Sequence, residues 1–184
     1  ELLLKKLAGK FKGNDFFHIL KKIIRGYSPV PGKGLPIGTL TSQYFANYYL
    51  DSLDRFITAL AGVRACVRYM DDIVWWCDEK PAIKDSFAAV RHELEHGLLL
   101  NIKEKSVQIN KSRYGISYCG FRIFPGTVKI SQRKKKRYAL LSRKWEKLYL
   151  DGRINENQLS RCYDAVHSIT AQANTLEWRK KYWA

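Results

Sequence analysis

The sequence predicts an α+β fold in which helices cover one face of an antiparallel sheet. Two strand-like segments, 63–69 and 73–77, are rich in Val, Ile, Tyr and Trp and are separated by a short bend, which predicts a β-hairpin. Helix-like segments flank this hairpin, with apolar residues recurring every three or four positions. At 184 residues the chain is long enough to bury a hydrophobic core.

The first half of the chain predicts three helices separated by a loop. Residues 1–8 predict the end of one amphipathic helix, and residues 14–25 predict a second. Glycine and proline concentrate in 26–38, which predicts an ordered loop. A third helix is expected from Thr41, with Thr41 and Ser42 as candidate N-terminal caps.

The second half predicts a helix, several short strands and a helical tail. Pro81 and Gly97 suit the first position and the end of a helix. Strands are expected at about 98–101, 106–109, 116–122 and 128–130, followed by two helices in 131–184. This tail holds 13 basic and 5 acidic residues, so it carries half of the net charge.

The chain carries a formal net charge of +16, from 33 Lys and Arg against 17 Asp and Glu, which predicts a polyanionic partner. No apolar run approaches the roughly 18 to 20 residues that span a bilayer, and the first residues lack the order of a signal peptide. We therefore expect a cytoplasmic protein with no membrane partner. Cys66, Cys77, Cys119 and Cys162 form no C-x-x-C pair and are interpreted as reduced packing residues.

Two adjacent carboxylates, Asp71 and Asp72, occur in RYMDDIVWWC, at the tip of the predicted hairpin. Carboxylates held close together repel each other unless a cation lies between them. Mg²⁺ prefers oxygen ligands and commonly takes one or two carboxylates together with substrate phosphates. An ordinary Asp-Asp turn is the alternative. The apolar frame and the basic excess favour a metal site that handles phosphates.

Tyr69-Met70-Asp71-Asp72 resembles the Y-x-D-D motif of reverse transcriptases, and other segments resemble the family's motifs in order. Residues 32–54 resemble the loop and helix beneath the incoming nucleotide and template. LLLNIKEKS, residues 98–106, resembles the next motif, and YCGFRIF, residues 118–124, resembles the primer-grip hairpin. The basic helices that follow resemble a thumb.

The resemblance implies a partial fingers connection at 1–40, a polymerase palm at 41–130 and a helical, basic thumb at 131–184. It implies RNA-templated DNA synthesis from dNTPs, with an RNA template, a DNA primer and Mg²⁺, or alternatively Mn²⁺. Asp71 and Asp72 would be catalytic and bind metal. Nucleotide or template would contact Tyr69, Met70, Pro36, Ile37, Gly38, Ser42, Gln43 and Lys105, with Lys103 as the alternative to Lys105. The primer grip would comprise Cys119, Gly120 and Phe121, and the nucleic-acid backbone would meet Arg133, Lys134, Lys135, Lys136 and Arg137.

Ile37-Gly38 followed by Ser42-Gln43 is similar to the reverse transcriptases of diversity-generating retroelements. Group II intron enzymes instead carry Gln before this Gly and Ser-Pro after it. The resemblance implies error-prone copying at adenines and a small basic accessory protein. The family also places a metal-binding Asp upstream of the segment that here reads ELLLKKL. Because no Asp precedes Asp15, we expect a fragment that is inactive alone.

Two other functions stay open. His92-Glu93-Leu94-Glu95-His96 fits the H-E-x-x-H pattern of zinc hydrolases. A metzincin would also need Gly at 99 and His at 102, where the chain has Leu99 and Ile102, so this alternative is distant.

The nearer alternative is a non-catalytic RNA-binding module with a polymerase-like fold. It would grip phosphates with the basic run 133–137 and stack bases on Tyr138, Trp145 and Tyr149. Asp71 and Asp72 distinguish the two functions, because a pure binder has no use for anions where phosphates pass.

Overall fold

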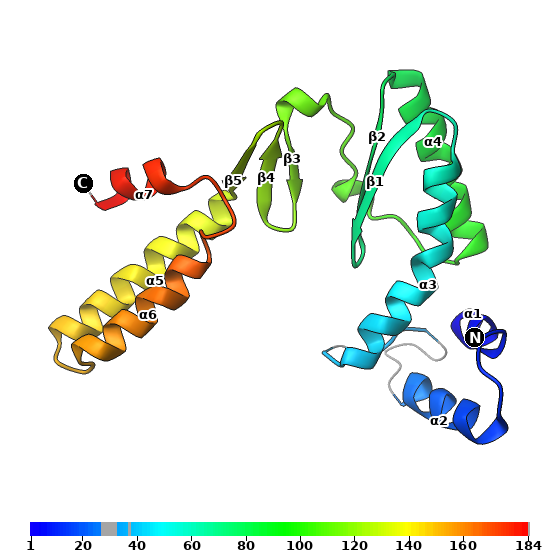
Figure 1. The fold of residues 1–184 in the computed structure, drawn as a ribbon, viewed down its shortest axis with the longest axis horizontal. Helices are drawn as coiled ribbons and strands as arrows, with labels where there is room; N and C mark the ends of the chain where they lie inside the picture. The colour runs from blue at the N-terminus through cyan, green and yellow to red at the C-terminus, as the bar shows by residue number, and fades with distance from the viewer. Residues whose placement is uncertain (27–32, 37, 184) are drawn as a thin grey trace. The chain divides into compact units, whose positions relative to one another are not determined.

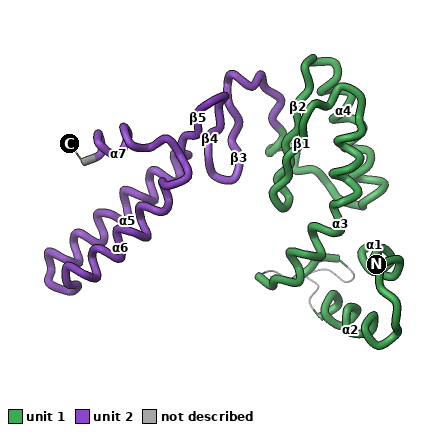
Figure 2. Tube along the Cα trace, viewed as in Figure 1, with its two compact units in different colours: residues 1–107 green, residues 108–184 purple. Residues whose placement is uncertain are grey.

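The computed structural model describes residues 1–26, 33–36 and 38–183, and the chain divides into two compact units (Figure 2). Unit 1 comprises Glu1–Val107 and unit 2 comprises Gln108–Ala184. Both combine helices with a small antiparallel sheet, which confirms the α+β class. The division falls inside the segment 41–130 rather than at either of its ends.

Unit 1 consists of four α-helices and one hairpin, in the described part of the chain (Figure 1). Strands β1 and β2 pair in antiparallel fashion, and α3 and α4 both contact this hairpin. The bounds are α1 Leu2–Ala8, α2 Asn14–Arg25, α3 Leu40–Ala59, β1 Val63–Tyr69, β2 Asp72–Cys77 and α4 Lys80–His92; a π-helical turn follows at Glu93–Gly97 and a 3-10 turn at Glu104–Ser106.

The core of unit 1 lies between α3, α4 and the inner face of the hairpin. Leu53 and Ile57 of α3 are fully buried, and Val90 of α4 is almost so. Ile73 and Trp75 of β2 pack against this cluster. Because these residues alternate along the strand, one hairpin face is apolar and faces the helices, as period-2 patterning requires.

Unit 2 consists of a three-stranded antiparallel sheet, in the order β3-β4-β5, followed by helices. Its bounds are a 3-10 turn at Ser112–Tyr114, β3 Ile116–Tyr118, β4 Phe121–Phe124, β5 Thr127–Ile130, α5 Gln132–Leu150, α6 Glu156–Ser168 and α7 Leu176–Trp183. Tyr138 of α5 is fully buried and meets Trp178 and Tyr182 edge-on, at ring-centroid distances of 5.2 and 5.6 Å. This aromatic cluster joins α5 to α7.

Several expected strands are wrong. Residues 98–101 and 106–109 form no strand. The π-turn takes backbone donors of 98–101, and the 3-10 turn takes the amides of Ser106 and Val107, which donate to Lys103 and Glu104. The Leu98 amide donates to Glu93 and the Leu100 amide to Leu94. The expected strand 116–122 is interrupted by a turn, two sheets replace one, and three helices replace two in 131–184.

The third helix also begins earlier than expected. Its N-terminal cap is Thr39, whose side chain accepts a hydrogen bond from the Ser42 amide, so Thr41 and Ser42 lie inside the helix. All four cysteines lie outside disulfides. Within the described ranges, no helix combines the length and apolar character needed to cross a membrane.

Candidate metal and nucleic-acid site

The paired carboxylates lie at a tight hairpin turn. Tyr69 pairs with Asp72 across the two strands, which leaves Met70 and Asp71 as the two turn residues. Asp72 is therefore the first residue of β2, one position earlier than expected. Met70 has a φ of 56°, in the left-handed region that residues with a side chain rarely adopt. Both Asp71 and Asp72 are exposed to solvent.

Arg68 connects this turn to α3 through hydrogen bonds. Its Nη1 donates to the carbonyl oxygen of Met70 at 2.9 Å and to Asn47 Oδ1 at 2.9 Å. Its Nε and Nη2 each donate to one carboxylate oxygen of Asp54, both at 2.7 Å. The Arg68 side chain is only 10% exposed. The hydrogen bond to Asp54 raises the pKa of Arg68 above its usual range.

The Arg68 network ties the turn to α3, and the sequence motifs did not predict it. Two patterns could have found it. Asn47 and Asp54 are seven residues apart, which places them on one side of a helix. Arg68 lies two positions after Cys66, so both are on the strand face that packs against α3.

The tip suits a hard divalent cation. Asp71 and Asp72 offer exposed carboxylate oxygens, the ligands that Mg²⁺ prefers, and phosphates and water commonly supply the rest. The charge of Arg68 is balanced by the bidentate Asp54 carboxylate. No cluster of three or more His, Cys, Asp or Glu suited to a metal occurs among the described residues.

The residues next to the carboxylates present an open surface. Tyr69 is 61% exposed and Val67, on the same face of β1, is 49% exposed. Trp76 of β2 adds a further exposed ring, while Met70 is half-buried. This outer face is the opposite of the face that packs on α3.

The predicted nucleotide loop leads into α3. Gly38 has a φ of 88°, with no atom within 4 Å of where a Cβ would lie, so the backbone conformation and not crowding favours glycine. Ser42 is buried, and its hydroxyl lies 2.7 Å from the Thr39 hydroxyl within the helix cap. Pro36 is half-buried and Gln43 is exposed, whereas Ile37 lies outside the described residues.

Lys103 and Lys105 are both exposed, and the structure does not choose between them. They flank Glu104, which forms a 2.8 Å ion pair with Arg91. The pair anchors this 3-10 turn to the end of α4.

The predicted primer-grip residues form a second tight hairpin turn, in unit 2. Cys119 and Gly120 have φ values of 48° and 76°, as in a type I′ turn, and join β3 to β4. The ammonium of Lys134 lies 3.3 Å from the centroid of the Phe121 ring, and burial lowers the pKa of Lys134. This turn therefore rests against the first turn of α5.

The basic run 133–137 divides between two roles. Lys134 and Lys135 are half-buried, with Lys135 over the Trp178 ring at 5.5 Å. The other three residues of the run are exposed. Three more exposed cations follow along α5 at helical spacing. We call this surface the α5 basic stripe: Arg133, Lys136, Arg137, Arg143, Lys144 and Lys147.

The three aromatics expected to stack on bases differ in exposure. Tyr138 is fully buried in the unit 2 core, so its predicted role in base stacking is wrong. Trp145 is half-buried, and Tyr149 is 42% exposed. The apolar face of α5 packs against the apolar residues of α6 and α7. The sequence pattern alone does not distinguish such a packing face from a face that binds nucleic acid.

His92 and His96 are exposed, and their rings stack with centroids 4.4 Å apart. The carbonyl of His92 lies 3.1 Å from His96 Nδ1. No third ligand accompanies them among the described residues.

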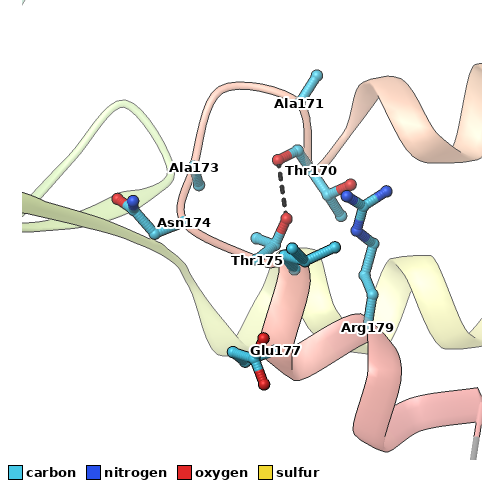
Figure 3. Close-up of a pocket in the computed structure, with 8 residues that line it drawn as sticks. Thr170, Ala171, Ala173, Asn174, Thr175, Glu177 and Arg179 are labelled. Carbon is cyan, nitrogen blue, oxygen red and sulfur yellow. Dashed lines mark hydrogen bonds between the residues drawn. The ribbon is translucent and has the colours of Figure 1, made fainter.

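A shallow hollow of about 450 Å³ lies where α6 leads into α7 (Figure 3). Thr175 donates its hydroxyl hydrogen bond to the carbonyl of Thr170, so that polar group serves the local backbone. The hollow contains none of the predicted site residues.

Comparison with models of known protein families finds no match to this chain, and comparison with curated proteins finds none either.

Proposed function

We propose that the hairpin tip is the metal-binding part of an RNA-directed DNA polymerase, of the bacterial kind found in diversity-generating retroelements and located in the cytoplasm. The observation that carries this proposal is the turn at Met70 and Asp71, which presents two exposed carboxylates on a clamped frame. The strong basic excess supports a polyanionic substrate.

In this proposal Asp71 and Asp72 hold the divalent ion. A bound Mg²⁺ would activate the attacking hydroxyl and stabilise the leaving oxygens, as in other nucleotidyl transfers. Tyr69 offers an exposed ring beside the carboxylates and would form part of the floor beneath primer and nucleotide. Gly38 would let the backbone approach a base or sugar closely.

The remaining contacts would orient nucleic acid and nucleotide. The turn of Cys119 and Gly120 would hold the primer end, and the α5 basic stripe would contact phosphates. Lys105 or Lys103 would meet the nucleotide phosphates. The RNA template, the DNA primer and a small basic accessory protein are part of the proposal because of the sequence resemblance alone.

A non-catalytic RNA-binding module is the second candidate. The α5 basic stripe favours it, because six exposed cations on one helix face bind phosphate without any metal. Both candidates predict RNA binding, and only the polymerase needs Asp71.

Primer extension with dNTPs and Mg²⁺ on an RNA template tests the choice. It is run on this chain and on the longest form that its gene encodes, each as wild type, Asp71→Asn and Asp78→Asn. Asp78 is the matched control, since it is an exposed carboxylate just past the other end of β2. The polymerase account expects extension that Asp71→Asn abolishes and Asp78→Asn spares. Tight RNA binding without extension in any form would make the binding module the better account.

A further inference from the structure

The Arg68 side chain hydrogen-bonds to the backbone of the turn that carries Asp71. The left-handed Met70 is unfavourable for a residue with a Cβ, so something must stabilise it. The Met70 carbonyl accepts a hydrogen bond from the partly buried guanidinium of Arg68, at 2.9 Å from Nη1. No glycine stands in this turn to relieve the strain, in contrast to Gly120 in the second hairpin.

The guanidinium is itself held in place. Asp54 accepts from two of its nitrogens, and Asn47 accepts from the third, which also donates to the Met70 carbonyl, so α3 supplies two of its three hydrogen-bonding partners. A planar, forked donor is required for this arrangement, because a lysine ammonium cannot make parallel bonds to a carboxylate while also reaching two other acceptors. The length of α3 between Asn47 and Asp54 therefore acts as a rigid base for the turn.

We propose that Arg68 is a positioning residue, which clamps the Met70–Asp71 turn on α3 and so preorganises the Asp71 carboxylate before any ion binds. This role rests on the proposed function in one respect, namely that the Asp71 carboxylate binds a metal ion. The clamp leaves Arg68 outside the reacting groups, because Nε, Nη1 and Nη2 all donate hydrogen bonds to α3 or to the turn.

The test compares Arg68→Lys with Arg64→Lys. Arg64 is the matched control, because it lies on the same strand and forms an ion pair with Asp78 at 2.6 Å, while its side chain is 70% exposed. Amide hydrogen exchange of Met70, Asp71 and Asp72 is measured by NMR on the full chain. We expect exchange at these amides to accelerate at least about tenfold in Arg68→Lys and to stay unchanged in Arg64→Lys, relative to the slow amides of α3.

Calorimetric titration with Mn²⁺ supplies a second readout, the dissociation constant. At a temperature where all forms are folded, a general loss of stability would not change this constant. Arg68→Lys should raise the dissociation constant at least about threefold, and Arg64→Lys should not. Equal exchange in the two variants overturns the clamp, whatever the metal does. Faster exchange in Arg68→Lys, with no Mn²⁺ binding even in the wild type, keeps the clamp and contradicts the metal function.

Discussion

The ammonium of Lys134 lies 3.3 Å from the centre of the Phe121 ring and so connects α5 to the β3–β4 hairpin. Cation–π contacts stabilise by about 0.5–2 kcal/mol, towards the upper end when the cation is desolvated. We expect Lys134→Gln to lower the free energy of unfolding of unit 2 by about 1 kcal/mol. Lys136→Gln, at an exposed position on the same helix, should change it by less than about 0.5 kcal/mol. Urea denaturation followed by circular dichroism measures both, and equal losses would rule out a structural role for the contact.

Alkaline pH should weaken the α5–α6 pair through Tyr163. Its hydroxyl donates to Glu146 Oε1 at 2.6 Å, and burial together with this acidic partner raises the pKa of Tyr163 above its usual value. The folded state then keeps a proton that the unfolded state loses above about pH 10, so stability is full below that pH and falls as pH rises further. Urea midpoints at about pH 8 and pH 11 should therefore separate more in the wild type than in Tyr163→Phe. Tyr44→Phe, at a 69% exposed site, should behave as the wild type does, and a Tyr163→Phe protein with the wild-type pH dependence would contradict the assignment.

Tyr138 should matter for folding and not for direct base contact. Its ring is fully buried against Trp178 and Tyr182, so Tyr138→Ala leaves a cavity and should cost about 3–5 kcal/mol of unfolding free energy. Tyr149→Ala, on the same helix at 42% exposure, should cost about 1 kcal/mol or less. Thermal and urea unfolding of the two variants provide the comparison. A stable Tyr138→Ala protein that has lost RNA affinity would restore the base-stacking role.

The α5 basic stripe should set the salt dependence of RNA binding. Each phosphate contact contributes about 0.7–0.9 to the slope of log affinity against log salt. Replacing Arg133, Lys136 and Arg137 by Gln should therefore reduce the slope by about 2–3 if all three contact phosphate. Fluorescence anisotropy with a labelled RNA measures it. Arg153, Arg161 and Lys180, exposed cations of unit 2 outside α5, form the charge-matched control set, and an equal effect there would indicate general charge attraction instead.

The elements that local pattern determines were predictable from sequence, and those that depend on packing were not. The 63–69 strand, the hairpin and the turn at Pro125–Gly126 follow from residue type and spacing, and the structure has them. The strand expected at 98–101 did not form because the apolar Leu98 fills the core at the end of a π-helical turn. A short apolar run looks the same in either setting.

The candidate site shows the same division. The position of Asp71 and Asp72 at a hairpin tip was predictable, because two strand-like runs bound them. Its support was only partly predictable: the spacing of Asn47 and Asp54 and the strand position of Arg68 indicate facing sides, but the three residues meet only once α3 packs against β1. Likewise, the burial of Lys134 within a run of five cations depends on the Phe121 ring beside it, and no charge count indicates which cation is covered.

The most direct test of the account is the location of a bound divalent ion. Mn²⁺ substitutes for Mg²⁺ and broadens the NMR signals of nearby nuclei, so a titration of the full chain maps the site by residue. The account predicts that the amides of Asp71 and Asp72 broaden first, and that Asp71→Asn removes the effect while Asp78→Asn keeps it. Broadening centred on His92 and His96, or spread evenly over the acidic surface, would contradict the claim that the hairpin tip is the metal site.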